Sequence, residues 1–308
     1  MGDCNASSRD FSCVAGTRVV SQVRGDEDWI RSPCILGVDE AGRGPVLGPM
    51  VYASAFCPLS SDISGRGYAD SKTLTHEARE KLFRAIDANT SVGWVAHIMS
   101  AQHISHNMLG RDKVSLNSLA FDATCHVIRT ALESGASVKQ VYVDTVGDAD
   151  RHSERLSRAF PGISFTVCPK ADSLYPIVSA ASIIAKVIRD KSLIDCRQAL
   201  GLQGEVGTGY PGDATTVAWL KEHIHPVLGF PPLVRHSWET CARMLEPPEA
   251  ISVNFEADDA ADGLGTSGSS QQRLNFVRPG GAGVVETSGL GRHTFFRSRK
   301  LQRVAEAF

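Results

Sequence analysis

Residues 35–45 read Ile-Leu-Gly-Val-Asp-Glu-Ala-Gly-Arg-Gly-Pro, and this stretch carries more information about the fold than any other in the chain. An apolar run leads directly into two adjacent carboxylates, Asp39 and Glu40. The apolar run predicts a buried strand that fixes both carboxylates in space. Paired carboxylates repel each other and are costly to bury unless a divalent cation or a shared proton relieves them. The stretch therefore predicts a strand that ends at a cation site.

The Gly42-Arg43-Gly44 turn follows the two acids at once and is closed by a proline. Glycines allow the backbone to approach a ligand closely, and the guanidinium of Arg43 matches the geometry of a phosphate. Carboxylates for a metal beside donors for a phosphodiester indicate metal-dependent nucleic-acid chemistry. The local pattern also fits a strand that ends in a solvated acidic turn, and this alternative stays open on the pattern alone.

Two further apolar runs lead to acids. Residues 141–143 end at Asp144, and residues 165–171 lead to Asp172. Adjacent strands lie about 4.8 Å apart, so acids at matching heights can share two cations about 3.5–4 Å apart. Oxygen ligands favour Mg²⁺ or Mn²⁺ over zinc. Neighbours on a regular strand face opposite sides, so Asp39 and Glu40 reach one cluster only through a bulge or turn. Each acid taken alone could simply cap the next element.

The order of the predicted elements indicates the α/β class, a mixed sheet with helices on its faces. Strands are predicted over 34–40, 49–57, 92–99, 141–144 and 163–168, and helices over 76–88, 115–134, 150–159, 176–199, 213–223 and 237–246. The expected organisation is an N-terminal tail over 1–30, a main domain over 31–199, a helical subdomain over 200–248, and a linker with a basic tail over 249–308. The tail includes a short ordered piece near 17–23. The linker is too rich in Gly, Ser and Asp to offset its ordering entropy.

The composition limits the classes of protein that need to be considered. A net charge of −2 over 308 residues gives no global attraction to nucleic acid, so polyanion binding requires a local basic surface. The 8 cysteines include no Cys-x-x-Cys pair, which argues against a zinc or thioredoxin-type site and fits a reducing compartment. No run of roughly 18 apolar residues predicts a membrane span. The N-terminus lacks the basic and apolar regions of a secretory signal.

An ordered set of motifs resembles the type 2 ribonucleases H, the ribonuclease HII family. The motifs occupy 37–45, 70–74, 143–147, 170–172, 179–186 and 207–211, and His236-Ser237-Trp238 fits the family's final helix. The resemblance covers about 34–246, and the motifs at 143–147 and 229–231 are most similar to those of the eukaryotic catalytic subunit. It implies a ribonuclease H-like sheet flanked by helices, with an appended C-terminal helical subdomain.

The resemblance also implies a site, residue by residue. The metal-binding and catalytic acids fall on Asp39, Glu40, Asp144 and Asp172, with two divalent ions, Mg²⁺ or Mn²⁺, as cofactors. The turn that contacts the ribose 2′-OH falls on Gly42, Arg43 and Gly44, and the tyrosine that stacks at the RNA–DNA junction falls on Tyr210. Lys72, Ser182 and Lys186 resemble contacts to backbone phosphates. Ser173 and Gly212 depart from the Ala and Asn expected there, which puts loop details in doubt.

The implied activity is an endoribonuclease that cuts RNA in RNA–DNA hybrids and 5′ of single ribonucleotides in duplex DNA. A two-metal mechanism leaves 3′-OH and 5′-phosphate ends and serves ribonucleotide excision repair and primer removal. The expected partners are these nucleic acids and two accessory proteins of a heterotrimer, with no membrane. A nuclear location is expected, with a mitochondrial one as the alternative. The rival interpretations are another ribonuclease H-like nuclease, such as a resolvase or exonuclease, and a non-enzymatic scaffold, which has no need of costly clustered carboxylates.

Overall fold

A six-stranded mixed sheet forms the centre of the computed structural model, which describes residues 9–23, 28–61, 63, 74–145 and 147–246. The strands are β1 Thr17–Gln22, β2 Cys34–Ala41, β3 Met50–Pro58, β4 Gly93–Met99, β5 Val138–Asp144 and β6 Ser164–Cys168. Their order across the sheet is β1-β4-β3-β2-β5-β6. The first four pair antiparallel, whereas β2, β5 and β6 run parallel. The carboxyl ends of β2, β5 and β6 therefore meet at one edge of the sheet.

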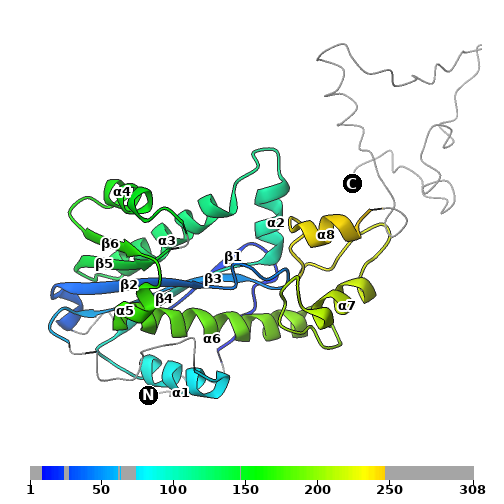
Figure 1. Cartoon of the computed structure of the whole chain (residues 1–308). Coiled ribbons are helices and arrows are strands. Elements are labelled where there is room, and N and C mark those ends of the chain that lie inside the picture. The colour runs from blue at the N-terminus through cyan, green and yellow to red at the C-terminus, as the bar shows by residue number, and fades with distance from the viewer. Residues whose placement is uncertain (1–8, 24–27, 62, 64–73, 146, 247–308) are drawn as a thin grey trace, which may run out of the picture. The chain divides into compact units, whose positions relative to one another are not determined.

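Helices cover both faces of the sheet (Figure 1). The helices are α1 His76–Asp87, α2 Ala101–Leu109, α3 Leu116–Glu133, α4 Ala149–Ala159, α5 Ala171–Leu174, α6 Pro176–Ala199, α7 Ala214–Glu222 and α8 Glu239–Met244, with a 3-10 turn η2 over Asp28–Arg31. The long α6 packs with α1 on one face, and α3 packs with α2 and α4 on the other. This arrangement confirms the predicted fold class.

A glycine in the middle of β2 sets how closely α6 approaches the sheet. A Cβ added at Gly37 would lie 2.5 Å from the carbonyl carbon of Ile177 and 2.6 Å from the nitrogen of Val178. Both contacts are to backbone in the first turn of α6, which begins at Pro176 as the sequence predicts. Any side chain at this position would push the helix away from the strand that carries Asp39.

The helices after residue 199 share a core with the sheet domain. Trp219 of α7 and Cys241 of α8 are buried together with Leu47, which follows β2, and Leu193 of α6. An isolated bridge between Leu47 and Val234 reinforces this contact. The predicted helical subdomain is thus packed directly against the segment that follows the Gly-Arg-Gly turn.

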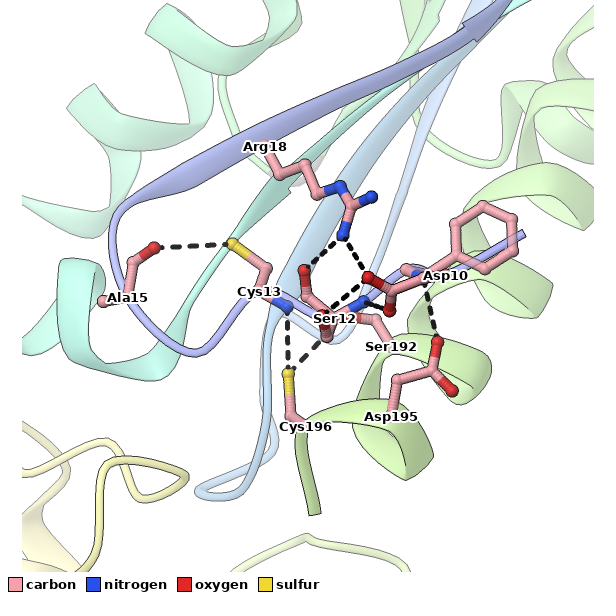
Figure 2. Close-up of polar contacts among 9 residues, drawn as sticks. Asp10, Ser12, Cys13, Ala15, Arg18, Ser192, Asp195 and Cys196 are labelled. Atoms are coloured by element: carbon pink, nitrogen blue, oxygen red, sulfur yellow. Dashed lines mark hydrogen bonds and ion pairs between the residues drawn. The ribbon is translucent and has the colours of Figure 1, made fainter. Parts of the chain in front are cut away.

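The N-terminal segment is more ordered than the predicted tail over 1–30. The short ordered piece expected near 17–23 is β1, which pairs with β4 along its whole length and forms an edge of the sheet. Before it, the amide of Phe11 donates to Asp195 Oδ2 at 2.8 Å, and the amide of Cys13 donates to Cys196 Sγ at 3.2 Å (Figure 2). Phe11 is only 1% exposed. The ordered piece predicted near 17–23 is therefore present, although β1 buries neither of its faces fully and its sequence shows no strong apolar period.

Most predicted element boundaries lie within two residues of those in the structure, but η2 and α5 were not predicted, and neither was α2. Its N-cap is Ser100, whose hydroxyl accepts from the amide of His103 at 3.0 Å. The predicted linker and tail over 249–308 lie outside the described residues. No helix in the described part of the chain is both long enough and apolar enough to cross a membrane.

Candidate active site

Three carboxylates meet at the carboxyl edge of the parallel strands. Asp39 lies near the end of β2, Asp144 ends β5, and Asp172 lies in α5, directly after β6. One carboxylate oxygen from each lies within 4.8 Å of the other two. Asp39 and Asp172 are buried, at 5% and 2% exposed. Within the residues that the structure describes, no other three or more His, Cys, Asp or Glu side chains come this close. Such a set of oxygen ligands fits a hard divalent cation.

The turn after β6 brings Asp172 to the site. Lys170 adopts a left-handed conformation with φ of 59°, which bends the chain sharply into α5. Asp144 Oδ1 accepts from the amide of Ala171 at 3.1 Å and from the amide of Thr145, also at 3.1 Å. The first bond ties the end of β5 to the start of α5. It therefore fixes the spacing between the two carboxylates.

Asp39 is held in a strongly desolvated position. The pKa of its carboxyl is raised to about 7, chiefly by burial and in part by the charge of Asp144, although a hydrogen bond from Ser182 and the charge of Lys186 act in the opposite direction. Ser182 is fully buried on α6. Its hydrogen bond positions Asp39, and the phosphate contact of Ser182 stays a prediction. Lys186 is partly buried beside the carboxylates, and its phosphate contact stays a prediction.

Glu40 approaches the site from the other face of β2. The strand is regular here, with Asp39 opposite Ala53 and Glu40 opposite Tyr52, so no bulge brings the two acids to one side. Glu40 is accordingly outside the group of three close carboxylates. It still interacts electrostatically with all three. Its pKa is raised to about 8, chiefly by burial and next by the charge of Asp39, whereas the charge of Arg43 acts to lower it.

The Gly-Arg-Gly turn is held from behind by two residues that come just before α8. The Arg235 guanidinium donates from Nη2 to the carbonyl of Gly42 at 2.5 Å and from Nη1 to the carbonyl of Arg43 at 3.0 Å. The indole of Trp238 donates to the carbonyl of Gly44 at 3.0 Å. In a trans peptide the N–H points opposite to the preceding carbonyl. The amides of Arg43 and Gly44 therefore face away from Arg235.

Arg235, which holds the turn in place, is a residue that the sequence analysis missed. It is 0% exposed, and burial lowers its pKa to about 9. Its Nε donates to the carbonyl of Gly48 at 3.0 Å, and its guanidinium lies 4.8 Å from the centre of the Trp238 ring. Carbonyl oxygens thus satisfy the buried cation. The one available signal in the sequence was an arginine directly after the apolar pair Leu233-Val234.

Tyr210 lies against the turn, as the resemblance implies. A Cβ added at Gly44 would come within 3.1 Å of Cε1 of the Tyr210 ring. The carbonyl of Gly209 accepts from the amide of Val46 at 2.7 Å, which attaches the tyrosine loop to the chain just after the turn. The ring remains 51% exposed and is free to contact a ligand. Gly42 itself needs its glycine, because its φ is +79° and a Cβ would lie 2.6 Å from a backbone oxygen.

The structure thus brings most of the predicted site residues to one edge of the sheet. The carboxylates, the turn, the tyrosine and the lysine of α6 gather there, and they comprise Asp39, Glu40, Asp144, Asp172, Gly42, Arg43, Gly44, Tyr210 and Lys186. Lys72 lies outside the described residues.

Comparison with known proteins identifies the class. A model of the family described as Ribonuclease HII matches residues 36–241. The A subunit of ribonuclease H2 from Arabidopsis thaliana is 41% identical over 289 residues, covering 91% of this chain and 97% of the relative. The A subunit of the Homo sapiens enzyme is 50% identical over 241 residues, covering 76% and 80%. The solved ribonuclease H2 of Pyrococcus horikoshii OT3 is 33% identical with a TM-score of 0.58, covering 69% of this chain and 97% of that one.

The fold, the carboxylates and these similarities define a ribonuclease H, a nuclease of the hydrolase class. More particularly, the chain belongs to the ribonuclease HII family.

Proposed function

We propose that this protein is the catalytic subunit of a ribonuclease H2 and cuts on the 5′ side of a ribonucleotide in duplex DNA or in an RNA–DNA hybrid. The observation that carries the proposal is the adjacency of two parts. Asp39 is one of three carboxylates that have oxygens within 4.8 Å of one another. The turn at 42–44 follows directly after the end of β2, the strand that carries Asp39. A ribose bound at the turn would place the neighbouring phosphodiester beside the carboxylates.

The carboxylates are suited to hold two divalent ions. Asp39, Asp144 and Asp172 would bind on one side of the strand exit, and Glu40 would contribute from the other. Oxygen ligands suit Mg²⁺ or Mn²⁺, which when bound supply Lewis-acid stabilisation and a more acidic water. The predicted products are a 3′-OH and a 5′-phosphate.

The turn supplies the selectivity for ribose. Because Arg235 occupies the carbonyls of Gly42 and Arg43, the amides of Arg43 and Gly44 face away from it and are available to a ligand. An amide donor can bind the 2′-OH, which distinguishes RNA from DNA at one position. The half-exposed ring of Tyr210 offers a surface on which the adjoining sugar or base can stack.

Cleavage of defined duplexes by the purified chain tests the proposal. A duplex with one ribonucleotide should be cut 5′ of it in Mg²⁺, whereas an all-DNA duplex and a four-way junction should stay intact. Asp144→Asn should abolish cleavage while retaining binding, and Asp122→Asn, at an exposed position on α3, should cut like the wild type. Junction cleavage would favour a resolvase, and binding without any cleavage would favour a scaffold.

The similarity to the A subunits of ribonuclease H2 enzymes supports a further part of the proposal, that two accessory proteins join this chain in a heterotrimer. Comparing the activity of the chain alone with that of the chain purified from its native cells, together with whatever copurifies, tests this. A nuclear location is also proposed. Imaging of the tagged full chain checks it, and an exclusively mitochondrial signal would contradict it.

A further inference from the structure

A cavity of about 360 Å³ opens between α3 and α4, next to the carboxylates. Glu40 and Asp144 line one part of it, and Arg43 of the turn lines it as well. The remaining wall carries two more arginines, Arg151 and Arg155, both from α4. The cavity therefore joins the proposed metal site to a cationic surface that the proposed function does not yet use.

The arginines of α4 divide into two groups. Arg151 and Arg155 are four residues apart, so they project from the same face of the helix, toward the cavity. Arg158 instead pairs with Glu154 at 2.5 Å on the exposed side. None of the ion pairs found within the described residues includes Arg151 or Arg155. The two cavity arginines thus keep their charge available for an anion.

Neighbouring groups hold this surface in place. The guanidinium of Arg155 lies 3.7 Å from the centre of the Phe121 ring, and this cation–π contact holds the arginine in the wall. The one further acid in the wall, Asp148, caps α4 by accepting from the amide of Arg151 at 3.0 Å. The carboxylate of Asp148 is therefore engaged at the N-terminus of α4 and forms no ion pair with the two cavity arginines among those found in the described residues.

The opposite wall offers neutral donors. Ser115, the N-cap of α3, lines the cavity together with Asn117 and Ser118 of the first turn. The first amides of a helix and short polar side chains together favour a bound anion. On the α4 side, His152 hydrogen-bonds Thr145 through Nδ1 at 3.1 Å, and its Nε2 is without a partner among the described atoms. The cavity wall therefore still has at least one buried polar atom, His152 Nε2, that a bound ligand could engage.

We propose that this cavity binds a backbone phosphate of the cleaved strand on the 5′ side of the scissile bond. The inference rests on the proposed function, in which the ribose lies at the turn and 3′ of the cut. Tyr210 lies just before α7, and α4 is well separated from α7 in the molecule (Figure 1). A strand that passes from Tyr210 across the carboxylates reaches this cavity next, because Glu40 and Asp144 line it. A protein with a net charge of −2 needs such a local cationic surface to hold a polyanion.

The test neutralises one phosphate and one arginine at a time. The probe is a duplex with a single ribonucleotide in which a methylphosphonate replaces each phosphate in turn, and its affinity is measured in EDTA so that no cleavage occurs. In the wild type, one position 5′ of the cut should lose about tenfold in affinity, the size expected for a charge-assisted contact. Arg155→Gln should lose a similar factor and then be insensitive to methylphosphonate at that position.

Matched variants separate this role from a general effect of charge. Arg158→Gln removes the same charge from the same helix outside the cavity and should bind like the wild type. Arg155→Lys should recover most of the reduced affinity if charge is what matters. The slope of log affinity against log salt should fall by about 0.9 for each phosphate that the protein no longer neutralises. Melting temperatures near the wild-type value for all variants would show that the fold is intact.

The outcomes also separate this inference from the proposed function. If Arg151→Gln/Arg155→Gln binds no worse than Arg158→Gln, or if the sensitive phosphate lies 3′ of the cut, the phosphate site is overturned. Cleavage 5′ of the ribonucleotide by the wild type would remain intact in both cases. Failure of the wild type to cut that duplex in Mg²⁺ would instead overturn the proposed function.

Discussion

Replacing Asp39 with asparagine should stabilise the metal-free protein, although it should destroy a metal ligand. The carboxyl is 5% exposed, and burial raises its pKa from the ordinary 3.8 to about 7. The folded state therefore holds the proton more tightly than the unfolded state does. In the absence of metal, this carboxyl does not reduce the free energy of unfolding below about pH 4, where it is protonated in both states. Its ionisation reduces the free energy of unfolding as the pH rises toward 7.

The size of the effect follows from the two pKa values. The interval from 3.8 to about 7, at about 1.36 kcal/mol for each pH unit, corresponds to roughly 4 kcal/mol above pH 7. Asparagine keeps an acceptor for the amide of Glu40 and the hydroxyl of Ser182 but carries no charge. Asp39→Asn should therefore gain up to roughly 4 kcal/mol at pH 8 and almost nothing near pH 4.

Thermal unfolding followed by circular dichroism in EDTA checks this at both pH values. For a unit of this size each kcal/mol shifts the melting temperature by roughly 2–4 °C. Adding Mg²⁺ at pH 8 should raise the melting temperature of the wild type and leave that of Asp39→Asn unchanged. Asp122→Asn, an exposed acid, is the control. A metal-free Asp39→Asn protein that melts below the wild type at pH 8 would refute the reasoning.

Substitutions at Gly37, Arg235 and Tyr210 test the contacts that hold the site in place. Gly37→Ala places a methyl group 2.5 Å from the α6 backbone and should cost about 3 kcal/mol or more in urea unfolding, whereas Gly212→Ala, with nothing within 4 Å, should be near neutral; equal midpoints would contradict the close approach. Arg235→Lys keeps the positive charge but loses the planar guanidinium that donates to several carbonyls at once. It should lower both the melting temperature and the preference for a ribonucleotide-containing duplex over an all-DNA duplex. An unchanged preference would show that Arg235 does not act through the turn. Tyr210→Ala should reduce kcat/KM on that duplex about tenfold while Tyr210→Phe keeps most of it, and a larger loss in the phenylalanine variant would mean that the hydroxyl matters more than the ring.

Local sequence was sufficient for the strands that carry the acids. Asp39 and Asp144 each end an apolar run, and parallel strands bring such ends to one edge of the sheet. Their grouping with Asp172 could therefore be predicted before the fold was known. The placement of Glu40 could not, because it depends on whether β2 stays regular to its end. The hydrogen bond from Ser182 to Asp39 could not be predicted either, because a motif does not reveal that the surrounding turns of α6 are buried on all sides.

Other features depend on contacts that no local pattern encodes. Arg235 reaches the turn at 42–43 from nearly two hundred residues away, and its role appears only when the chain has folded. β1 has a weak apolar period because it lies at an edge and is never fully covered. Structure can be predicted best where the pattern of one short segment shows which of its residues are buried. It can be predicted least where the contacts of a residue come from a segment far away in the sequence.

The hydrogen bond from Arg235 to the turn also sets when the turn can become ordered during protein synthesis. The two residues joined by Nη1 and the carbonyl of Arg43 are 192 positions apart. At a synthesis rate of roughly 5–20 residues per second, the turn leaves the ribosome some 10–40 s before the arginine that orients it. Only after Asp172 has been made, 63 residues before Arg235, does a nascent chain have all the acids but not yet the arginine that holds the turn. Because Arg235 is made after all of these acids, the turn is fixed only once the carboxylates of the site have been synthesised.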